Sequence, residues 1–270
     1  MCAVPPVEAE QEISKKTLLG APLELGDGWV WSSPEEVKCV LSRVRDVCLS
    51  GLRLLSDRQP ERVRVDNLGD YTKGWPHIWL HADPPDMAWI FLNVPSRDWS
   101  QLARQFGHEF GHVFCNSWDV SAVPGPPTQW LEEAMVEAFT IRGLGLLASS
   151  WEKNPPFAGD QAFAATIREH RADRLKMYNK EGDQDIASWF RDHRSELESG
   201  PRNKDLAVVK ILPILEDERA CVEDLGAVNR WPARSRIPIE EYLVNWETSC
   251  AEIGAPGLLP GRLRFLFKVR

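Results

Sequence analysis

Residues 107–116 read GHEFGHVFCN, and two histidines in this stretch lie four positions apart with a glutamate directly after the first. Residues four apart on a helix are neighbours on one face, so the imidazoles of His108 and His112 can reach one metal ion. Glu109 is turned about 100 degrees from His108 and can address a water molecule beside that ion. The spacing therefore predicts a metal site with a general base, and zinc is the metal that this pattern favours.

The helix that carries these residues must also bury an apolar face. We expect it to begin at a Ser96 cap and to run to about Asn116. At 100 degrees per residue, His108 and His112 lie almost opposite the apolar side chains, so the helix can pack on a core and still point both rings into a cleft. The apolar stripe consists of Leu102, Phe106, Phe110, Val113 and Phe114.

A catalytic zinc ion takes three protein ligands and keeps one position for water, so a third ligand is needed. A third histidine six residues after His112 is excluded, because that position is Trp118. Carboxylates are available in TQWLEEAMVEAF at 128–139, where we expect a second helix from a Thr128 cap to about Leu147. A solvated acidic helix face formed by Glu132, Glu133 and Glu137 is the alternative interpretation.

HEFGH followed by a helix reading WLEEAMVEA resembles the gluzincin clan of zinc peptidases, which includes the thermolysin-like enzymes and the aminopeptidase group. In that clan the third ligand is a glutamate on a second helix, often within W-L-x-E-G. The resemblance implies that Glu133 is this ligand and that Glu137 binds a ligating histidine through a hydrogen bond. Ala134 stands where the clan usually has Gly. The similarity covers only about thirty to fifty residues, so it identifies a site rather than a particular family.

The resemblance also implies an activity, the hydrolysis of a peptide bond by a zinc-bound water whose proton Glu109 accepts. Gluzincins supply one more donor to the oxyanion, a tyrosine or histidine from the helical lobe. His193, which follows Asp192, is favoured for this role over Tyr178, and an ordinary surface role stays equally open for either residue. Cys115 follows His112 by about one turn and is expected to be a small buried residue rather than a ligand.

Other functions stay open at this point. One alternative is a binding or regulatory protein that keeps a peptidase-like scaffold without turnover. Another is an enzyme with one narrow substrate, such as a toxin or effector. A third is a helical interaction protein in which the histidine motif arose by chance. The presence of Glu109 favours a catalytic site, because a structural zinc site needs no base.

The remaining chain predicts an α+β protein, with a small mixed sheet and the active-site helix followed by a mainly helical C-terminal lobe, and the resemblance implies a zincin-like metallopeptidase fold. We expect an irregular arm over 1–32, an N-terminal α/β lobe over 33–120 and a helical lobe over 121–270. The predicted strands are RVRVDN at 62–67, HIWLHA at 77–82 and AWIFLNV at 88–94. Helices are predicted from Pro34, capped by Ser33, to about Gly51, and over 160–179, 184–198, 204–219 and 238–252.

The third strand is nearly all apolar, so we expect cover on both faces, or a ligand on one of them. The resemblance implies that a peptide substrate pairs with an edge of this strand, from Trp89 to Val94. Five of the twelve tryptophans lie in the first ninety residues. We predict that they fill the core, with an aromatic wall for ligand contact as the alternative.

The net charge of −8 argues against nucleic acid as the main partner, and no apolar stretch has the length of a membrane span. The first residues, MCAVPPVEAEQEISKK, lack the basic start and apolar stretch of a signal peptide. We therefore expect a cytoplasmic protein, and export by a route without a cleaved signal stays open. No C-x-x-C pair occurs, which predicts free thiols for Cys2, Cys39, Cys48, Cys115, Cys221 and Cys250.

Overall fold

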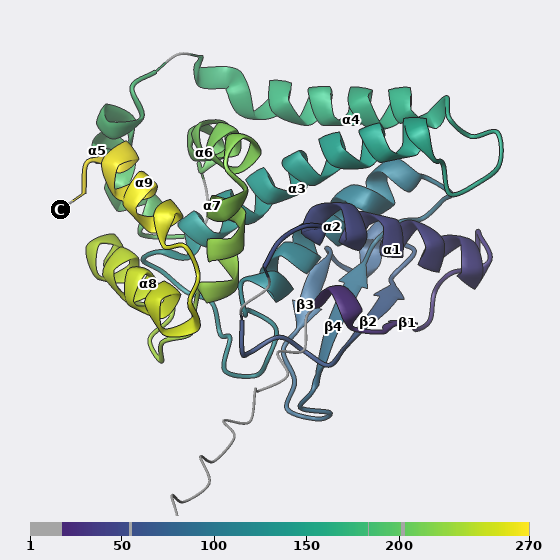
Figure 1. Cartoon of the computed structure of the whole chain (residues 1–270), viewed down its shortest axis with the longest axis horizontal. Helices are drawn as coiled ribbons and strands as arrows, with labels where there is room; N and C mark the ends of the chain where they lie inside the picture. The colour runs from purple at the N-terminus through teal and green to yellow at the C-terminus, as the bar shows by residue number, and fades with distance from the viewer. Residues whose placement is uncertain (1–17, 54–55, 183, 201–202, 270) are drawn as a thin grey trace, which may run out of the picture.

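A four-stranded sheet lies against a larger group of helices in the computed structural model, which describes residues 18–53, 56–182, 184–200 and 203–269 (Figure 1). The strand order is β1-β2-β4-β3. The pairs β1–β2 and β2–β4 are parallel, whereas β3 runs antiparallel to β4 and forms an edge of the sheet. The strands are β1 (Leu23–Leu25), β2 (Arg62–Asn67), β3 (His77–Trp79) and β4 (Met87–Leu92).

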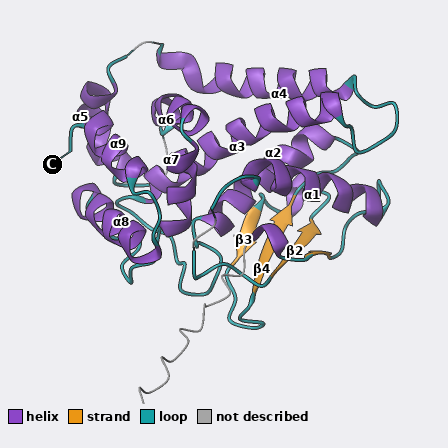
Figure 2. Cartoon of the chain, viewed as in Figure 1, coloured by secondary structure: helices purple, strands orange, loops and turns teal. Residues whose placement is uncertain are grey.

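Helices make up most of the chain after β4, and Figure 2 shows them in purple above and beside the orange strands. The mixed α+β class is therefore confirmed. The α-helices are α1 (Pro34–Leu49), α2 (Trp99–Phe114), α3 (Gln129–Lys153), α4 (Phe163–Tyr178), α5 (Ile186–Leu197), α6 (Asp205–Asp217), α7 (Arg219–Glu223), α8 (Ile239–Ile253) and α9 (Leu258–Phe267). Short 3-10 turns are η1 (Leu18–Gly20), η2 (Tyr71–Lys73), η3 (Asn179–Glu181) and η4 (Asp224–Ala227).

Two parts of the chain fold more regularly than predicted. The supposed irregular arm over 1–32 contains η1 and β1, and residues 1–17 lie outside the described part. Strand β1 has only three residues, too few to show a detectable alternating pattern. Its extended conformation depends on its pairing with β2. Helix α9 was not predicted, because its LLPGRLRFLF sequence contains Pro and Gly. Pro260 lies in the first turn, where a backbone N–H has no intrahelical acceptor, so the helix tolerates it.

Some helix ends and caps also differ from prediction. Helix α2 begins after Asp98, whose carboxylate accepts from Gln101 N at 3.0 Å, rather than at Ser96. Thr128 precedes α3 as predicted, but its hydroxyl donates to the Ser235 carbonyl at 2.7 Å and does not cap the helix. Helix α3 continues to Lys153, six residues past its predicted end. The Ser33 cap of α1 is confirmed by a 3.2 Å bond from Glu36 N.

One hydrophobic core runs from β1 to α9. Helix α3 packs against α1 and α2 on one side and against α4 and α6 on the other, so it joins the sheet layer to the C-terminal helices. The predicted division at residue 120 therefore marks a change from mixed to helical structure within a shared core. All five apolar residues of the α2 stripe are buried, as predicted: Leu102, Phe106, Phe110, Val113 and Phe114.

Strand β4 divides its side chains between two environments. Ala88, Ile90 and Leu92 are fully buried beneath the helices. Trp89 and Phe91 lie on the opposite face, where they stack with Trp79 and His77 of β3. The core-filling prediction is thus wrong for Trp79, which is 51% exposed, and for Trp75, which is 80% exposed. These rings form an aromatic face of the sheet, and a ligand for it stays a prediction.

None of the described helices is long and apolar enough to cross a bilayer. Free thiols are confirmed for the five described cysteines, of which Cys39 is exposed and the others are buried. Cys2 lies outside the described residues.

Asn116 connects the end of α2 to the C-terminal helices. It is buried with a left-handed φ of 61°. Its side-chain Nδ2 donates to the backbone carbonyls of Gly226 at 2.8 Å and Val228 at 2.7 Å. Its side-chain Oδ1 accepts from Ser56 Oγ at 2.7 Å. The residue therefore satisfies buried backbone groups and permits the chain reversal after the histidine helix.

We predict that Asn116→Ala lowers the free energy of unfolding by about 3 kcal/mol, because three buried hydrogen bonds are lost and alanine disfavours a positive φ. Urea denaturation measures the change. Asn116→Gly permits the backbone conformation, so it should recover only the smaller, conformational part of the loss. Wild-type stability in the alanine variant would contradict this account of the residue.

Candidate metal centre

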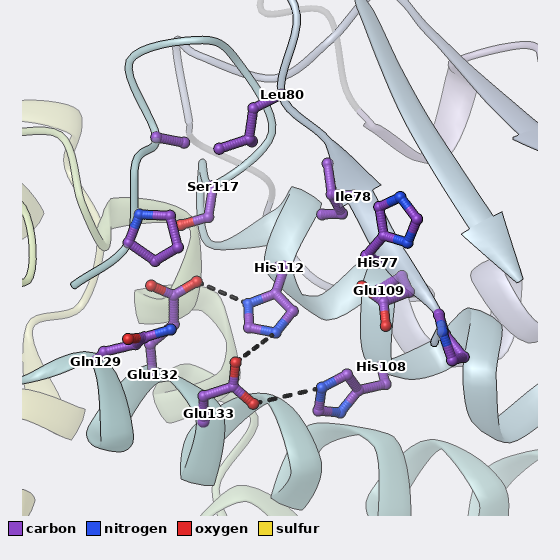
Figure 3. A pocket seen from close by; sticks show the side chains of 13 residues that line it. His77, Ile78, Leu80, His108, Glu109, His112, Ser117, Gln129, Glu132 and Glu133 are labelled. Carbon is purple, nitrogen blue, oxygen red and sulfur yellow. Dashed lines mark hydrogen bonds and ion pairs between the residues drawn. The ribbon is translucent and has the colours of Figure 1, made fainter. Parts of the chain in front are cut away.

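Helices α2 and α3 bring His108, His112 and Glu133 to one place, with the three side chains directed toward each other (Figure 3). His108 Nε2 lies 3.6 Å from Glu133 Oε2, and His112 Nε2 lies 3.5 Å from Glu133 Oε1. One ligand atom from each residue can be chosen so that all three atoms lie within 4.8 Å of one another. The structure thus unites the three residues predicted as metal ligands.

This spacing fits a zinc ion. Ligand atoms at the corners of a tetrahedron, each about 2.0–2.1 Å from zinc, are about 3.4 Å apart. Each of the two observed nitrogen–oxygen separations, one to either oxygen of Glu133, is close to this value. Two imidazole nitrogens and one carboxylate form a donor set that suits zinc and leaves a coordination position for water. The residues therefore fit the predicted metal, and their role as ligands stays a prediction.

The other nitrogen of each ring contacts a second carboxylate. His112 Nδ1 and Glu132 Oε1 form a 2.8 Å hydrogen bond. His108 Nδ1 lies 2.9 Å from Glu137 Oε2, an ion-pair distance without the alignment of a hydrogen bond. A carboxylate at each Nδ1 atom favours a proton there, so the Nε2 atoms, which face Glu133, are the ring atoms available to a metal ion. Glu137 thus lies where the resemblance implies, whereas the role of Glu132 as partner of His112 was not predicted.

Both outer carboxylates have further partners in the chain after α3. Glu132 Oε2 accepts from Asn229 Nδ2 at 2.7 Å, and Asn229 Oδ1 accepts from the Tyr242 hydroxyl at 3.2 Å. Glu137 Oε1 accepts from Arg174 at 3.1 Å. Glu132 is 4% exposed and Glu137 is 2% exposed. The alternative of a solvated acidic helix face is therefore wrong.

Electrostatics within this cluster are strong. Burial alone would lower the pKa of His108, but contacts with Glu133 and Glu137 outweigh it and raise that pKa to about 9. Burial also opposes protonation of His112, and Glu133 together with Glu132 raises its pKa well above the usual value. Glu133 has its pKa held well below the ordinary range by His112, His108 and Lys204, against the effect of burial. A metal ion that binds here takes the place of ring protons.

Glu109 lines the same pocket as the predicted ligands. It is 6% exposed, and burial raises the pKa of its carboxyl, partly offset by the nearby His108 and His112. A raised carboxyl pKa suits a group that must accept a proton and later return it. The pocket has a volume of ≈ 320 Å³ and an apolar wall formed by Ile78, Leu80, Ala122 and Pro124.

Neither predicted oxyanion partner lies at the pocket. His193 lies on α5, where its Nδ1 is 2.9 Å from the carbonyl of Trp189 in the same helix and its ring stacks on that indole. Tyr178 is buried at the end of α4, contacts Arg174, whose guanidinium donates to Glu137 at 3.1 Å, and does not line the pocket. The helical pattern predicted that these residues lie on helices, but it could not predict where those helices pack relative to the pocket. Cys115 is fully buried and does not line the pocket, as expected.

The strand predicted to bind the substrate, β4, is not an edge of the sheet. Residues 89–91 of β4 pair with β3 on one side and with β2 on the other. Farther along, Asn93 N donates to Gln105 Oε1 at 2.7 Å, and Asn93 O accepts from Gln105 Nε2 at 2.8 Å. The stretch from Trp89 to Val94 therefore has no free edge. Strand β3 is the edge strand next to β4, and its residues His77 and Ile78 line the pocket.

Three residues at the centre were not found from the sequence: His77, Asn229 and Lys204. Lys204 Nζ lies 2.9 Å from Glu133 Oε2. Lys204 lies 71 residues after Glu133 and Asn229 lies 97 residues after Glu132, in segments with no recognisable spacing to the motifs. Only packing brings them to the site.

Comparison with protein-family models, curated proteins and solved structures gives no match. The functional inference therefore rests on the residues and geometry of the site.

Glu132→Gln should weaken zinc binding by about tenfold, because the variant loses the anionic partner that orients His112. Competition with a chromophoric chelator measures the affinity. Glu152→Gln is the control, since Glu152 lies exposed near the end of the same helix. Equal zinc affinity in the two variants would show that Glu132 does not support the ligand.

Proposed function

We propose that this chain is a zinc-dependent peptidase of the gluzincin type. The observation that carries the proposal is the convergence of His108, His112 and Glu133 beside Glu109 in one pocket. A carboxylate at each Nδ1 atom supports a metal-binding arrangement of the two rings. The sheet with its antiparallel edge strand beside the histidine helix supports a zincin-like fold.

Zinc, when bound, would lower the pKa of a coordinated water and polarise the carbonyl of a peptide bond. His108, His112 and Glu133 would hold the ion. Glu109 accepts the proton from the attacking water and returns it to the departing amine, which its buried carboxyl is suited to do. Glu109 is only 6% exposed, which limits the access of bulk water to this carboxyl.

We place the substrate along β3 rather than β4. An extended peptide can add to a sheet edge by backbone hydrogen bonds, and β3 is the edge that borders the pocket. The apolar wall formed by Ile78, Leu80, Ala122 and Pro124 would receive a nonpolar substrate side chain. A polypeptide substrate is therefore the class that this arrangement favours.

One observation favours the alternative of a silent or narrowly specific peptidase-like protein. No tyrosine lines the pocket of the described structure, and the histidine there besides the two predicted ligands is His77 on β3. The oxyanion donor that gluzincins take from the helical lobe thus has no counterpart among the pocket-lining residues. A binding or regulatory role would need the metal-binding residues but not this donor.

Glu109→Gln should retain zinc and lose peptide hydrolysis by about a hundredfold or more, because it keeps the shape of the side chain but removes the base. A broad peptide library, with and without a chelator, provides the readout. Glu152→Gln should cleave like the wild type. Absence of chelator-sensitive cleavage by the wild type would favour the binding or regulatory role.

Zinc should also stabilise the fold, by about 2.7 kcal/mol at a free concentration one hundred times the dissociation constant. Thermal unfolding with and without zinc measures this increment for each variant. His112→Ala should lose the increment, whereas His193→Ala should keep it, because His193 lies away from the pocket. An increment that survives in His112→Ala would place the ion elsewhere.

A further inference from the structure

Lys204 places a positive charge directly on the predicted carboxylate ligand. Its ammonium nitrogen lies 2.9 Å from Glu133 Oε2, the same oxygen that lies 3.6 Å from His108 Nε2. The Lys204 side chain is 19% exposed and that of Glu133 is 20% exposed. The pair is therefore largely withdrawn from water, where charges interact more strongly than at an open surface.

The requirements of helix α6 do not explain why a lysine occupies position 204. Lys204 stands at the N-cap of α6, where Ser, Thr, Asp or Asn is preferred, and it makes no side-chain capping bond. A cation at this end also faces the positive pole of the helix dipole. A residue that weakens local structure is expected where a site requires it. The contact that accounts for this lysine is the one with Glu133.

Packing holds the lysine backbone near the site. Helix α6 packs against α3, the helix that carries Glu133. The Lys204 carbonyl accepts from Val208 N at 3.1 Å and so belongs to the first turn of α6. The neighbouring carboxylates have other donors, Asn229 for Glu132 and Arg174 for Glu137. The charge of Lys204 is thus directed at the predicted ligand.

We propose that Lys204 is a competing cation built into the metal centre, which lowers the affinity of His108, His112 and Glu133 for a divalent metal ion. A metal ion and the ammonium are both attracted to the Glu133 carboxylate. The two cations repel each other when both lie beside it. The bound metal would then be exchangeable, and loading of the site would follow the free metal concentration. The inference deepens the proposed function, on whose metal site it rests.

A simpler role for Lys204 predicts the opposite effect. If the lysine only held Glu133 in position, its removal would leave a mobile ligand and weaker metal binding. If it competes with the metal, its removal strengthens binding. The sign of the change in affinity therefore distinguishes the two roles without any measurement of hydrolysis.

The test measures the Zn²⁺ dissociation constant of the full chain by chelator competition at fixed pH and ionic strength. Lys204→Met and Lys204→Asn both remove the charge, and asparagine is also a better N-cap, so that variant should fold at least as well. We expect both to bind Zn²⁺ about tenfold more tightly, which corresponds to about 1.4 kcal/mol. Lys204→Arg keeps the charge and should stay within about threefold of the wild type.

Lys38→Met is the matched control, because it makes the same change in net charge at an exposed position of α1 and should leave the affinity unchanged. Unchanged or weaker binding by both neutral variants, with the wild type binding one zinc per chain, would overturn the inference and leave the proposed function intact. Absence of stoichiometric binding in every protein, including the wild type, would overturn both.

Discussion

The close approach of α2 to α3 is the contact on which the rest of the site depends. Gly111, inside the HEFGH motif, faces Val136, and a Cβ atom added to this glycine would lie 2.8 Å from Val136 Cγ1. Gly107 faces Thr140 in the same way, with 3.4 Å to its methyl carbon. Two glycines one turn apart thus let the helix backbones approach closely enough for Glu133 to lie between the two histidines.

This packing collects more buried charge than a protein core normally tolerates. Glu109, Glu132 and Glu137 are all nearly inaccessible, and isolated charges at such positions would be costly. Each of Glu132 and Glu137 is compensated by an imidazole from α2 and by one donor from later in the chain, the Asn229 amide for Glu132 and the Arg174 guanidinium for Glu137. The C-terminal part of the chain therefore has a direct role at the site, because it provides the donors that hold the outer carboxylates in place.

Three neighbouring carboxylates of α3 thereby acquire different environments. Glu132 and Glu137 contact the outer nitrogens of the histidines, whereas Glu133 faces the inner ones and also contacts Lys204. Such a division is typical of a metal centre in which one carboxylate binds the ion and others orient its ligands. In the proposed metal centre Lys204 adds a restraint on the strength of binding, and the pocket beside β3 lies next to the site.

The histidine motif, the apolar stripe of α2 and the strands β2 and β4 were predictable, because each is encoded by the spacing of nearby residues. Glu133 was implied only by resemblance, because the sequence cannot show which of two adjacent glutamates faces α2. Adjacent helix positions differ by about 100 degrees, and the packing angle of the two helices selects between them.

Contacts between distant segments decided the remainder. The pairing of β3 with β4 removed the free edge predicted for residues 89–94, and the placement of α4 and α5 kept Tyr178 and His193 from the pocket. Lys204 and Asn229 reach the centre only because α6 and the segment before α8 pack beside α3. The sequence by itself determined the chemical groups and their local spacing. Tertiary structure decided which groups meet, because such contacts depend on the packing of whole elements rather than on periodicity within one of them.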